Sequence, residues 1–551
     1  MAEDYAQIEK IKSRSDLTLR FTKYVKPEIN VRSYQVTGAT LLWYCKNFLV
    51  ADACGLGKTL QTLLAFALTK ELRESRDQEP LKLVVATEKS AVLQWVEEVA
   101  NFLEGVTAQP VRAAHKEAGF KTPGDYRENL YNTTPADIVT MSHATFRLDW
   151  KKGRLLDLVK GSILVLDEAD LIRSSKSQIY QAIKTAASVA QGFKALTATP
   201  IYKSLEDYYN LLKIVAPTLF GDYKMFVRDY CVTERIRVPG KSGGWMWVDK
   251  VREFKNVPHF GHKARHFMIL RTPEDVGAEL PELWQKPVFL EMEPVQADLY
   301  QRADTGEFNV MPGAEIPRKK KDKTLETEEE VQERLVRTEE SKMVMLRRAL
   351  QVVDDPRILD QVGPSVKMEK LLQLLQGDLK DQHVVVFSQF RTCIDLIEKD
   401  LAEVGIETLR VTGAESTIEA RQEAMRRFRE PGPPYVMLLT SAGKKALNLQ
   451  VSGTLILYDQ PLSWGDAYQL IGRIRRMGST REHVLVIRLL VRDTVDEWIY
   501  KILSVEDKLV QECLSVGGTM EITADLLSFI IDKVKSGTKL EDAMKNYAGS
   551  R

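Results

Sequence analysis

Two stretches of the chain alternate short apolar runs with amphipathic segments of helical length, residues 48–215 and residues 365–500. Each run is strand-length, rich in β-branched residues and apolar at consecutive positions, as in a parallel sheet covered by helices on both faces. The pattern therefore predicts an α/β fold with two parallel-sheet lobes and helical insertions between and within them. The runs are 48–53, 82–87, 137–142, 163–168 and 194–199, then 383–388, 408–413, 435–440, 453–459 and 483–490.

The remaining segments have a different composition. Residues 221–262 include the run VPGKSGGWMWVDK, whose glycines and aromatic residues predict a hairpin or an irregular loop. Residues 305–345 carry a basic block and then an acidic one, which is typical of a solvated helix or an insertion. We expect a first lobe at 1–285 with an insertion at 215–270, a linker and charged helical insertion at 286–350, a second lobe at 351–505 and a C-terminal helical extension at 506–551.

Composition is that of a folded protein with several domains. The 551 residues are 44% hydrophobic and 28% charged, with a net charge of +1, so overall charge neither supports nor excludes a nucleic-acid partner. No apolar run reaches the roughly 18 residues of a membrane span, and the first residues lack the apolar segment of a secretion signal. The five cysteines form no C-x-x-C pair, which indicates a reducing compartment. We expect a monomer in the cytoplasm of a bacterial or phage-infected cell rather than in a nucleus.

The segment after the first apolar run carries the strongest chemical signal, Gly55-Leu-Gly57-Lys58-Thr59. Glycines let a backbone wrap closely around phosphate oxygens, and the helix that follows directs free N–H groups at the anion. We expect Lys58 to reach the β- and γ-phosphates of ATP and the Thr59 hydroxyl to bind Mg²⁺. The first glycine of the full phosphate-binding motif is replaced by Asp52.

Two further motifs complete a composite nucleotide site. Asp167 and Glu168 follow the run ILVL, where one carboxylate can bind Mg²⁺ and the other can orient the attacking water. Arg473 and Arg476 stand three residues apart on a predicted helix of the second stretch, so we expect them to share one face. Alone, that pair is typical of a basic helix that faces solvent or DNA. Combined with the other motifs, it predicts guanidinium groups that approach a γ-phosphate from a second lobe.

The order of these motifs resembles that of the Swi/Snf-type ATPases of helicase superfamily two over roughly residues 30–510. The resemblance implies two RecA-like lobes, Mg²⁺-dependent ATP hydrolysis and DNA, in duplex form, as the partner. It also implies movement along that duplex and a protein target bound to it. The motifs that carry it are RSYQ (32–35), ADACGLGKTLQT (51–62), VVATEKSAVLQWVEEVANF (84–102), TATPIYKSLEDYYNLLKIVAP (197–217), MILRTPEDVGAELPELWQKPVFLEMEPVQADLY (268–300), VVVFSQF (384–390), YDQPLSW (458–464) and QLIGRIRRMGSTREHVLVIRLLVRDTVDE (469–497).

The resemblance also implies a role for each motif residue. Recognition of the nucleotide falls to Arg32, Gln35 and Gln469. Binding of phosphate and Mg²⁺ falls to Gly55, Gly57, Lys58, Thr59, Asp167 and Glu168, with Arg473 and Arg476 as arginine fingers. Coupling of ATP to DNA falls to Thr197 and Thr199. Contacts with the DNA backbone fall to Ser142, His143, Ser388, Gln389, Ser441 and Ala442, because such positions at strand ends suit contacts that ignore sequence.

Departures from the family pattern leave alternatives open. Ala53 and Cys54 replace an acidic residue and a methionine, and Lys444 and Lys445 stand in a segment that is glycine-rich in the family. A switch or scaffold with a weakened motor is therefore one alternative. A strand-separating or branch-migrating helicase is a second, and RNA in place of DNA is a third. In the 221–262 segment, Trp245 and Trp247 stand beside Lys241 and Lys250, so they can stack on bases or pack within a hairpin.

Overall fold

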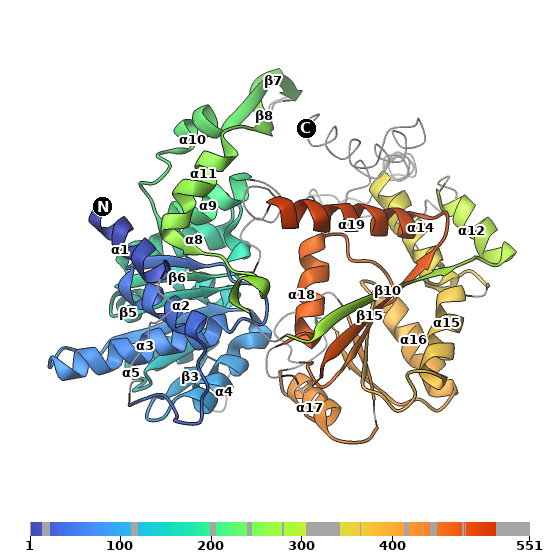
Figure 1. Ribbon diagram of the computed structural model, residues 1–551, viewed down its shortest axis with the longest axis horizontal. Helices are drawn as coiled ribbons and strands as arrows, with labels where there is room; N and C mark the ends of the chain where they lie inside the picture. Colours follow the sequence, from blue (N-terminus) through green and yellow to red (C-terminus); the bar gives the residue numbers. More distant parts are fainter. Residues whose placement is uncertain are drawn as a thin grey trace.

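The computed structural model describes residues 2–13, 23–111, 119–198, 205–239, 245–277, 280–304, 342–363, 365–412, 418–433, 435–440, 449–476, 479 and 481–513. Two lobes stand side by side, each built on a parallel sheet with helices on both faces (Figure 1). This confirms the predicted fold class.

The first lobe contains a seven-stranded sheet in the order β3-β4-β2-β5-β6-β1-β9, with every pair parallel. Neighbouring strand residues alternate between two cores: Val84 and Ala86 pack on one face, Leu83 and Val85 on the other. Burial on both faces explains why the predicted runs are continuously apolar. The strands are β1 (Asn47–Val50), β2 (Lys82–Thr87), β3 (Ala108–Pro110), β4 (Ile138–Ser142), β5 (Ser162–Asp167), β6 (Gly192–Leu196) and β9 (Met268–Ile269). The helices are α1 (Ala2–Ser13), α2 (Ser33–Tyr44), α3 (Lys58–Ser75), α4 (Val92–Phe102), α5 (Pro123–Thr133), α6 (His143–Lys151), α7 (Leu156–Lys160), α8 (Gln178–Val189) and α9 (Leu205–Val215).

The second lobe contains a six-stranded parallel sheet in the order β10-β15-β14-β11-β13-β12. Its strands also alternate between two cores, as Val386 and Phe387 do on β11. The strands are β10 (Glu282–Leu290), β11 (Val384–Phe387), β12 (Thr408–Val411), β13 (Val436–Leu439), β14 (Thr454–Leu457) and β15 (His483–Val491). The helices are α12 (Pro294–Asp304), α14 (Lys342–Asp354), α15 (Val366–Gln376), α16 (Arg391–Glu403), α17 (Ile418–Arg429), α18 (Trp464–Ile474) and α19 (Val495–Cys513).

The boundary between the lobes lies before β10, which corrects the predicted division at 285. All nine residues of β10 pair with β15, from Glu282 opposite His483 to Leu290 opposite Val491. Helices α12 and α14 also belong to the second lobe: Gln296 Oε1 of α12 accepts from Val366 N of α15 at 3.3 Å, and Leu350 of α14 packs in the core with Val386 of β11. The charged segment 305–341 and residues 514–551 of the predicted extension lie outside the described residues.

A hairpin projects from the first lobe (Figure 1). Strands β7 (Cys231–Pro239) and β8 (Trp245–Phe254) pair antiparallel between α10 (Tyr223–Tyr230) and α11 (Val257–Ala264), which confirms the hairpin predicted within 221–262. Stacking of Phe220 on Phe260, with ring centroids 4.2 Å apart, packs its base. Trp247 is 59% exposed, and the Arg235 guanidinium lies 6.0 Å from its ring centroid. Within the described ranges, no helix has the length and apolar character needed to cross a membrane.

Candidate nucleotide site between the lobes

The P-loop follows β1 and ends at the first residue of α3. Gly55 has φ +87° and Gly57 has φ +73°, a left-handed conformation that glycine adopts without steric cost. Lys58 Nζ donates to Asp52 O at 2.7 Å and to Ala53 O at 3.3 Å. The ammonium group therefore lies within the loop, where carbonyl oxygens that phosphate oxygens can replace accept its hydrogen bonds.

Asp52, which replaces the first glycine of the motif, does not face the phosphate side of the loop. Its carboxylate is fully buried and accepts hydrogen bonds from Arg271 Nε at 2.9 Å and Gln61 Nε2 at 3.0 Å. The departure at this position therefore has a structural explanation. The pair could not be predicted from the sequence, because Arg271 lies 219 residues further along the chain.

Two neighbours hold Asp167 at the end of β5. Thr87 Oγ1, at the end of adjacent β2, and Trp95 Nε1, on α4, each donate to Asp167 Oδ2 at 2.9 Å. Burial and the charge of Glu168 raise the pKa of Asp167, and these two hydrogen bonds oppose that rise. Neither neighbour was predicted from the sequence, although Thr87 ends a strand that is parallel and adjacent to the one ending at Asp167.

Glu168 has φ +52°, which is unusual for a residue with a Cβ atom. Strained backbone of this kind persists where the surrounding structure holds it, often at functional sites. Across the cleft, Arg473 Nη2 lies 3.6 Å from Glu168 Oε1. The structure thus brings the acid pair of the first lobe together with an arginine of the second.

Arg473 and Arg476 do not share a helix face, because α18 ends at Ile474. Both arginines nevertheless face the first lobe. Burial, together with the charge of Arg473, lowers the pKa of Arg476 to about 10, whereas Glu98 and Glu168 of the first lobe oppose that fall. Arg476 therefore keeps its positive charge at neutral pH. The lobes are in close contact here, since a Cβ atom added at Gly472 would come within 2.6 Å of Cys54 Cβ.

The residues predicted to recognise the nucleotide are all near this cleft. Arg32 caps α2 and its N–H donates to Gln35 Oε1 at 3.0 Å. Gln35 is buried, and its Nε2 donates to Leu56 O of the P-loop at 3.5 Å. Gln469 is buried on α18, one turn before Arg473. Their contact with adenine stays a prediction.

The first-lobe residues predicted to couple to DNA lie close to the acid pair. Ser142 caps α6 by accepting from Thr145 N at 3.1 Å, and His143 Nε2 lies 2.8 Å from Asp167 O. Thr197, at the end of β6, is fully buried and its N–H donates to Val50 O at 3.0 Å. These positions link strand ends to the nucleotide site, while contact with DNA stays a prediction. Thr199, Ser441 and Ala442 lie outside the described residues.

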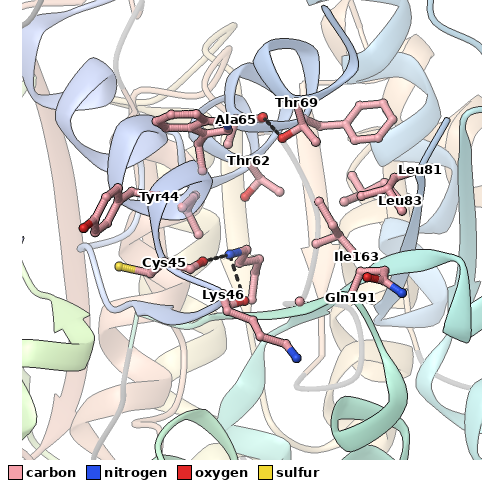
Figure 2. A pocket seen from close by; sticks show the side chains of 15 residues that line it. Tyr44, Cys45, Lys46, Thr62, Ala65, Thr69, Leu81, Leu83, Ile163 and Gln191 are labelled. Atoms are coloured by element: carbon pink, nitrogen blue, oxygen red, sulfur yellow. Dashed lines mark hydrogen bonds between the residues drawn. The ribbon is translucent and has the colours of Figure 1, made fainter. Parts of the chain in front are cut away.

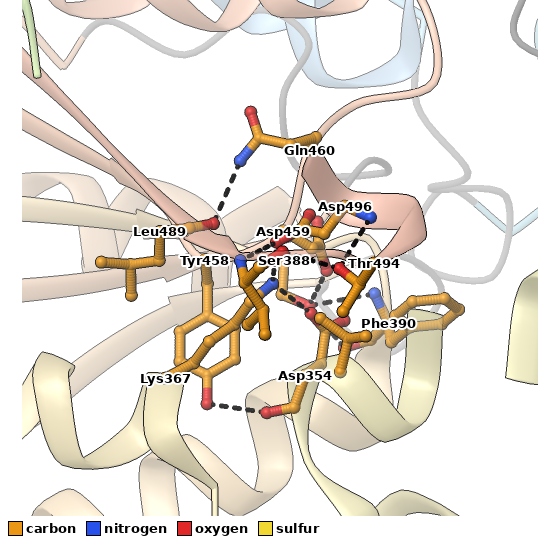
Figure 3. Close-up of polar contacts among 12 residues, drawn as sticks. Asp354, Lys367, Ser388, Phe390, Tyr458, Asp459, Gln460, Leu489, Thr494 and Asp496 are labelled. Atoms are coloured by element: carbon orange, nitrogen blue, oxygen red, sulfur yellow. Dashed lines mark hydrogen bonds and ion pairs between the residues drawn. The ribbon is translucent and has the colours of Figure 1, made fainter. Parts of the chain in front are cut away.

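In the second lobe, the Ser388 hydroxyl and the Gln389 backbone N–H donate hydrogen bonds to the buried carboxylate of Asp459. Ser388 Oγ donates to Asp459 Oδ2 at 2.6 Å, and Gln389 N donates to the same atom at 2.9 Å. Burial raises the pKa of Asp459 to about 6. Asp459 adjoins a buried group of Lys367, Asp354 and Asp496, shown in Figure 3, which sequence reasoning missed. The Ser388 hydroxyl is therefore directed into the protein, and a DNA contact at this loop stays a prediction.

A separate cavity of about 240 Å³ lies at the opposite end of the first sheet (Figure 2). Its lining includes Lys46, Ile163 and Gln191, near the starts of β1, β5 and β6. Lys194 Nζ donates to Cys45 O and to Lys46 O within it, and burial lowers the pKa of Lys194 to about 8. Parallel α/β sheets bind their ligands at the carboxyl ends of the strands, so this cavity is not the nucleotide site.

These features define the class of protein. Two parallel-sheet lobes, with a P-loop and an acid pair in one and arginines of the other facing them, form the ATPase core of helicase superfamily two. The chain belongs to the SNF2-related family: the SNF2-related domain matches residues 34–357, and the helicase conserved C-terminal domain matches residues 366–478. The resemblance seen in the motifs is thereby confirmed.

Among known proteins, the chain is 26% identical over 561 residues to "Chromodomain-helicase-DNA-binding protein 1-like" of Danio rerio, covering 95% of this chain and 49% of the relative. It is 27% identical over 512 residues to "Transcription regulatory protein SNF2" of Saccharomyces cerevisiae, covering 87% of this chain and 28% of the relative. The chain thus spans about half the length of these relatives, or less. A solved structure titled "Sulfolobus solfataricus SWI2/SNF2 ATPase core in complex with dsDNA" is 20% identical, with 95% of this chain and 99% of that chain covered and a TM-score of 0.37.

Proposed function

We propose that the chain is a duplex-DNA-stimulated ATPase that moves along double-stranded DNA and acts on protein bound to it. The observation that carries the proposal is the placement of Arg473 Nη2 3.6 Å from Glu168 Oε1, which joins the two lobes at the hydrolytic centre. A site built from two lobes links hydrolysis to their relative movement. The name of its Danio rerio relative, which includes DNA binding, supports DNA as the partner.

In this mechanism the phosphates of ATP replace the carbonyl oxygens now bound to Lys58 Nζ. Thr59 and Asp167 would hold Mg²⁺, because hydroxyl and carboxylate oxygens are the ligands that this cation prefers. When bound, Mg²⁺ would neutralise phosphate charge. The hydrogen bonds from Thr87 and Trp95 fix the Asp167 carboxylate in one orientation for that role.

Glu168 would orient the attacking water, and its engagement with Arg473 suggests how hydrolysis is restrained. While the guanidinium lies beside Glu168, it occupies the carboxylate that would orient the water and is not at the γ-phosphate. Transfer of Arg473 to the γ-phosphate would free Glu168 and place positive charge where negative charge develops. DNA that binds across both lobes would favour this transfer, which accounts for stimulation by DNA.

Steady-state ATP hydrolysis measured without nucleic acid, and with duplex DNA, single-stranded DNA, forked DNA or RNA, tests the proposal. We expect duplex DNA to stimulate hydrolysis strongly and Glu168→Gln to abolish the stimulated rate. Glu128→Gln, at an exposed carboxylate of the same lobe, is the matched control and should retain the wild-type rate. Stimulation only by forks or single strands would favour a strand-separating helicase, and stimulation only by RNA would exclude DNA as the substrate. Absence of any stimulation would favour a switch or scaffold.

Movement along DNA needs a separate assay. A third strand annealed to a duplex is released when a translocating protein passes through it, without separation of the two duplex strands. We expect ATP-dependent release by the wild-type chain and none by Glu168→Gln. Hydrolysis that duplex DNA stimulates, without release of the third strand, would contradict translocation and leave only a DNA-dependent ATPase.

A further inference from the structure

A buried ion pair joins the P-loop to the segment through which the chain leaves the first lobe. Arg271 Nε donates to Asp52 Oδ1 at 2.9 Å, and Arg271 Nη2 donates to Asp52 Oδ2 at 2.5 Å. This is the bidentate geometry of a strong, directional pair. Both residues are buried, Asp52 completely. Removal of either partner would leave a buried charge without compensation.

The same guanidinium group connects three elements around the nucleotide site. Arg271 Nη1 donates to Tyr34 O of α2 at 2.5 Å, and Nη2 donates to Gln61 Oε1 of α3 at 2.9 Å. Gln61 Nε2 in turn donates to Asp52 Oδ2 at 3.0 Å. The backbone adds to this connection, because Ala53 N donates to Arg271 O at 2.9 Å. Arg271 therefore fixes the start of the P-loop from both its side chain and its main chain.

Asp52 connects this network to the lysine that would bind phosphate. Its carboxylate is held by Arg271, while its carbonyl oxygen accepts from Lys58 Nζ at 2.7 Å. A displacement of Asp52 must therefore displace the group on which the Lys58 ammonium rests. The position of Lys58 depends on a residue that lies outside the motif itself.

Arg271 also stands at the start of the inter-lobe linker, which we define as the described residues 272–277 and 280–281. Val276 of this linker packs against a small apolar cluster formed by Ala53 and Leu56 of the P-loop together with Tyr34 of α2. At its far end, Pro281 O accepts a hydrogen bond from Arg475 Nε at 2.8 Å, and Arg475 lies between the two predicted arginine fingers. The linker is thus attached to the P-loop at one end and to the arginine motif at the other.

We propose that Arg271 is a positioning residue that sets the position of Lys58 through its ion pair with Asp52. Through the same contacts, Arg271 couples nucleotide binding at the P-loop to the position of the inter-lobe linker. The inference rests on the proposed ATP hydrolysis and names a residue through which the two lobes are coupled. Arg271 contacts the P-loop rather than the site of the phosphates, so it acts through Asp52. Its loss should therefore impair nucleotide binding and DNA stimulation more than the unstimulated turnover.

Arg271→Met tests this inference, because methionine keeps an unbranched side chain and removes the charge and every donor. Arg127→Met is the matched control. Arg127 Nε and Nη2 donate to the two oxygens of buried Asp149 at 2.5 and 2.8 Å, but that pair joins α5 and α6 rather than the P-loop. Each variant removes one buried bidentate pair from the same lobe, so both should lose thermal stability.

Kinetics measured below both melting transitions separate positioning from stability. For Arg271→Met we expect a KM for ATP raised about tenfold and duplex stimulation reduced about tenfold, with unstimulated kcat within about threefold of wild type. For Arg127→Met we expect all three quantities within about twofold of wild type. The Asp52→Asn and Arg271→Met double variant should be no worse than the poorer single variant, because both act through one pair.

The inference would be overturned if Arg271→Met, like Arg127→Met, left the KM for ATP and the stimulation by duplex DNA unchanged. The Arg271–Asp52 pair would then have a purely stabilising role. If Arg271→Met does not fold, Asp52→Asn is measured instead, and unchanged KM and stimulation would overturn the inference in the same way. Titration with a fluorescent ATP analogue keeps this test distinct from the proposed function. A wild-type chain without DNA stimulation would refute the proposed function, whereas unaltered analogue affinity in Arg271→Met would refute the positioning role.

Discussion

Replacement of Lys367 by methionine should destabilise the second lobe, and more strongly at higher pH. Lys367 lies on α15 with its Nζ 2.8 Å from Asp354 Oδ1 and 2.9 Å from Asp496 Oδ2, and all three side chains are fully buried (Figure 3). Asp459 adds a third buried carboxylate nearby. One ammonium group therefore compensates more negative charge than its own.

The size of the loss in folding stability follows from the carboxylate charges that stay buried once Lys367 is removed. Removal of one partner of a buried pair costs about 3–5 kcal/mol, because the remaining charge stays buried without compensation. Burial already raises the pKa of Asp354 and of Asp496 above the ordinary value of 3.8, and Lys367 opposes that rise. Without Lys367, one of these carboxylates would bind a proton instead. Protonation of a carboxyl group whose ordinary pKa is 3.8 would lower the free energy of unfolding by at most about 5 kcal/mol at pH 7.5 and about 1.6 kcal/mol at pH 5.

The sign of the pH dependence follows from where that proton is bound. In the variant the folded state holds a proton that the unfolded chain releases above pH 3.8, so stability falls as pH rises. We expect the penalty of Lys367→Met, relative to wild type, to grow by about 3 kcal/mol between pH 5 and pH 7.5.

Denaturant unfolding at pH 5 and pH 7.5, followed by circular dichroism, measures this penalty. Lys399→Met is the control, because Lys399 is 69% exposed and its ion pair with Glu403 spans 4.0 Å. The control should change stability by less than about 0.5 kcal/mol at either pH. A penalty for Lys367→Met below about 1 kcal/mol at pH 7.5, or one that grows as pH falls, would refute the reasoning. Adding Asp496→Asn to Lys367→Met should recover part of the loss at pH 7.5.

Two further predictions concern the nucleotide site and the hairpin. Arg473→Ala should lower the duplex-stimulated kcat about 10³-fold or more with little change in melting temperature, because an arginine finger acts on charge in the transition state. Arg426→Ala, at a 60% exposed arginine on α17, should leave kcat unchanged, and an equal loss in both variants would assign Arg473 no special role. Trp247→Ala should leave the melting temperature unchanged and weaken binding of forked or single-stranded DNA by about 1–3 kcal/mol, as loss of base stacking requires. Unaltered affinity in a binding titration would assign Trp247 to packing against Arg235.

The sequence pattern predicted every strand inside the two sheets and the edge strand β12, and it missed the other edge strands, β3, β9 and β10. All ten continuous apolar runs correspond to strands, because burial on two faces requires apolar residues at successive positions. The run Glu282–Leu290 was not recognised, since β10 is an edge strand with polar residues at exposed positions. That omission placed the lobe boundary too late. Strands β3 and β9, also at edges, are only three and two residues long and too short for a pattern.

The sequence by itself determined the type of chemistry at the site. Lys58, Glu168 and Arg473 were predicted as site residues because phosphate binding and hydrolysis need particular residue types after a strand, in a tight glycine loop and on a second lobe. Such motifs are local, and the backbone around each depends on a few neighbouring residues. The adjacency of Glu168 and Arg473 was inferred from motif order and appears in the structure as a 3.6 Å contact.

Only the tertiary structure decided which residues support those groups. The end of α18 at Ile474 placed Arg476 beyond the helix, and Asp52 gained Arg271 as its partner from far along the chain. Lys367 meets Asp354 and Asp496 from a third element of the second lobe. The physical reason is common to these cases. A buried charge must be compensated where it lies in space, and the residue that compensates it can come from any part of the chain that the fold brings within hydrogen-bonding distance.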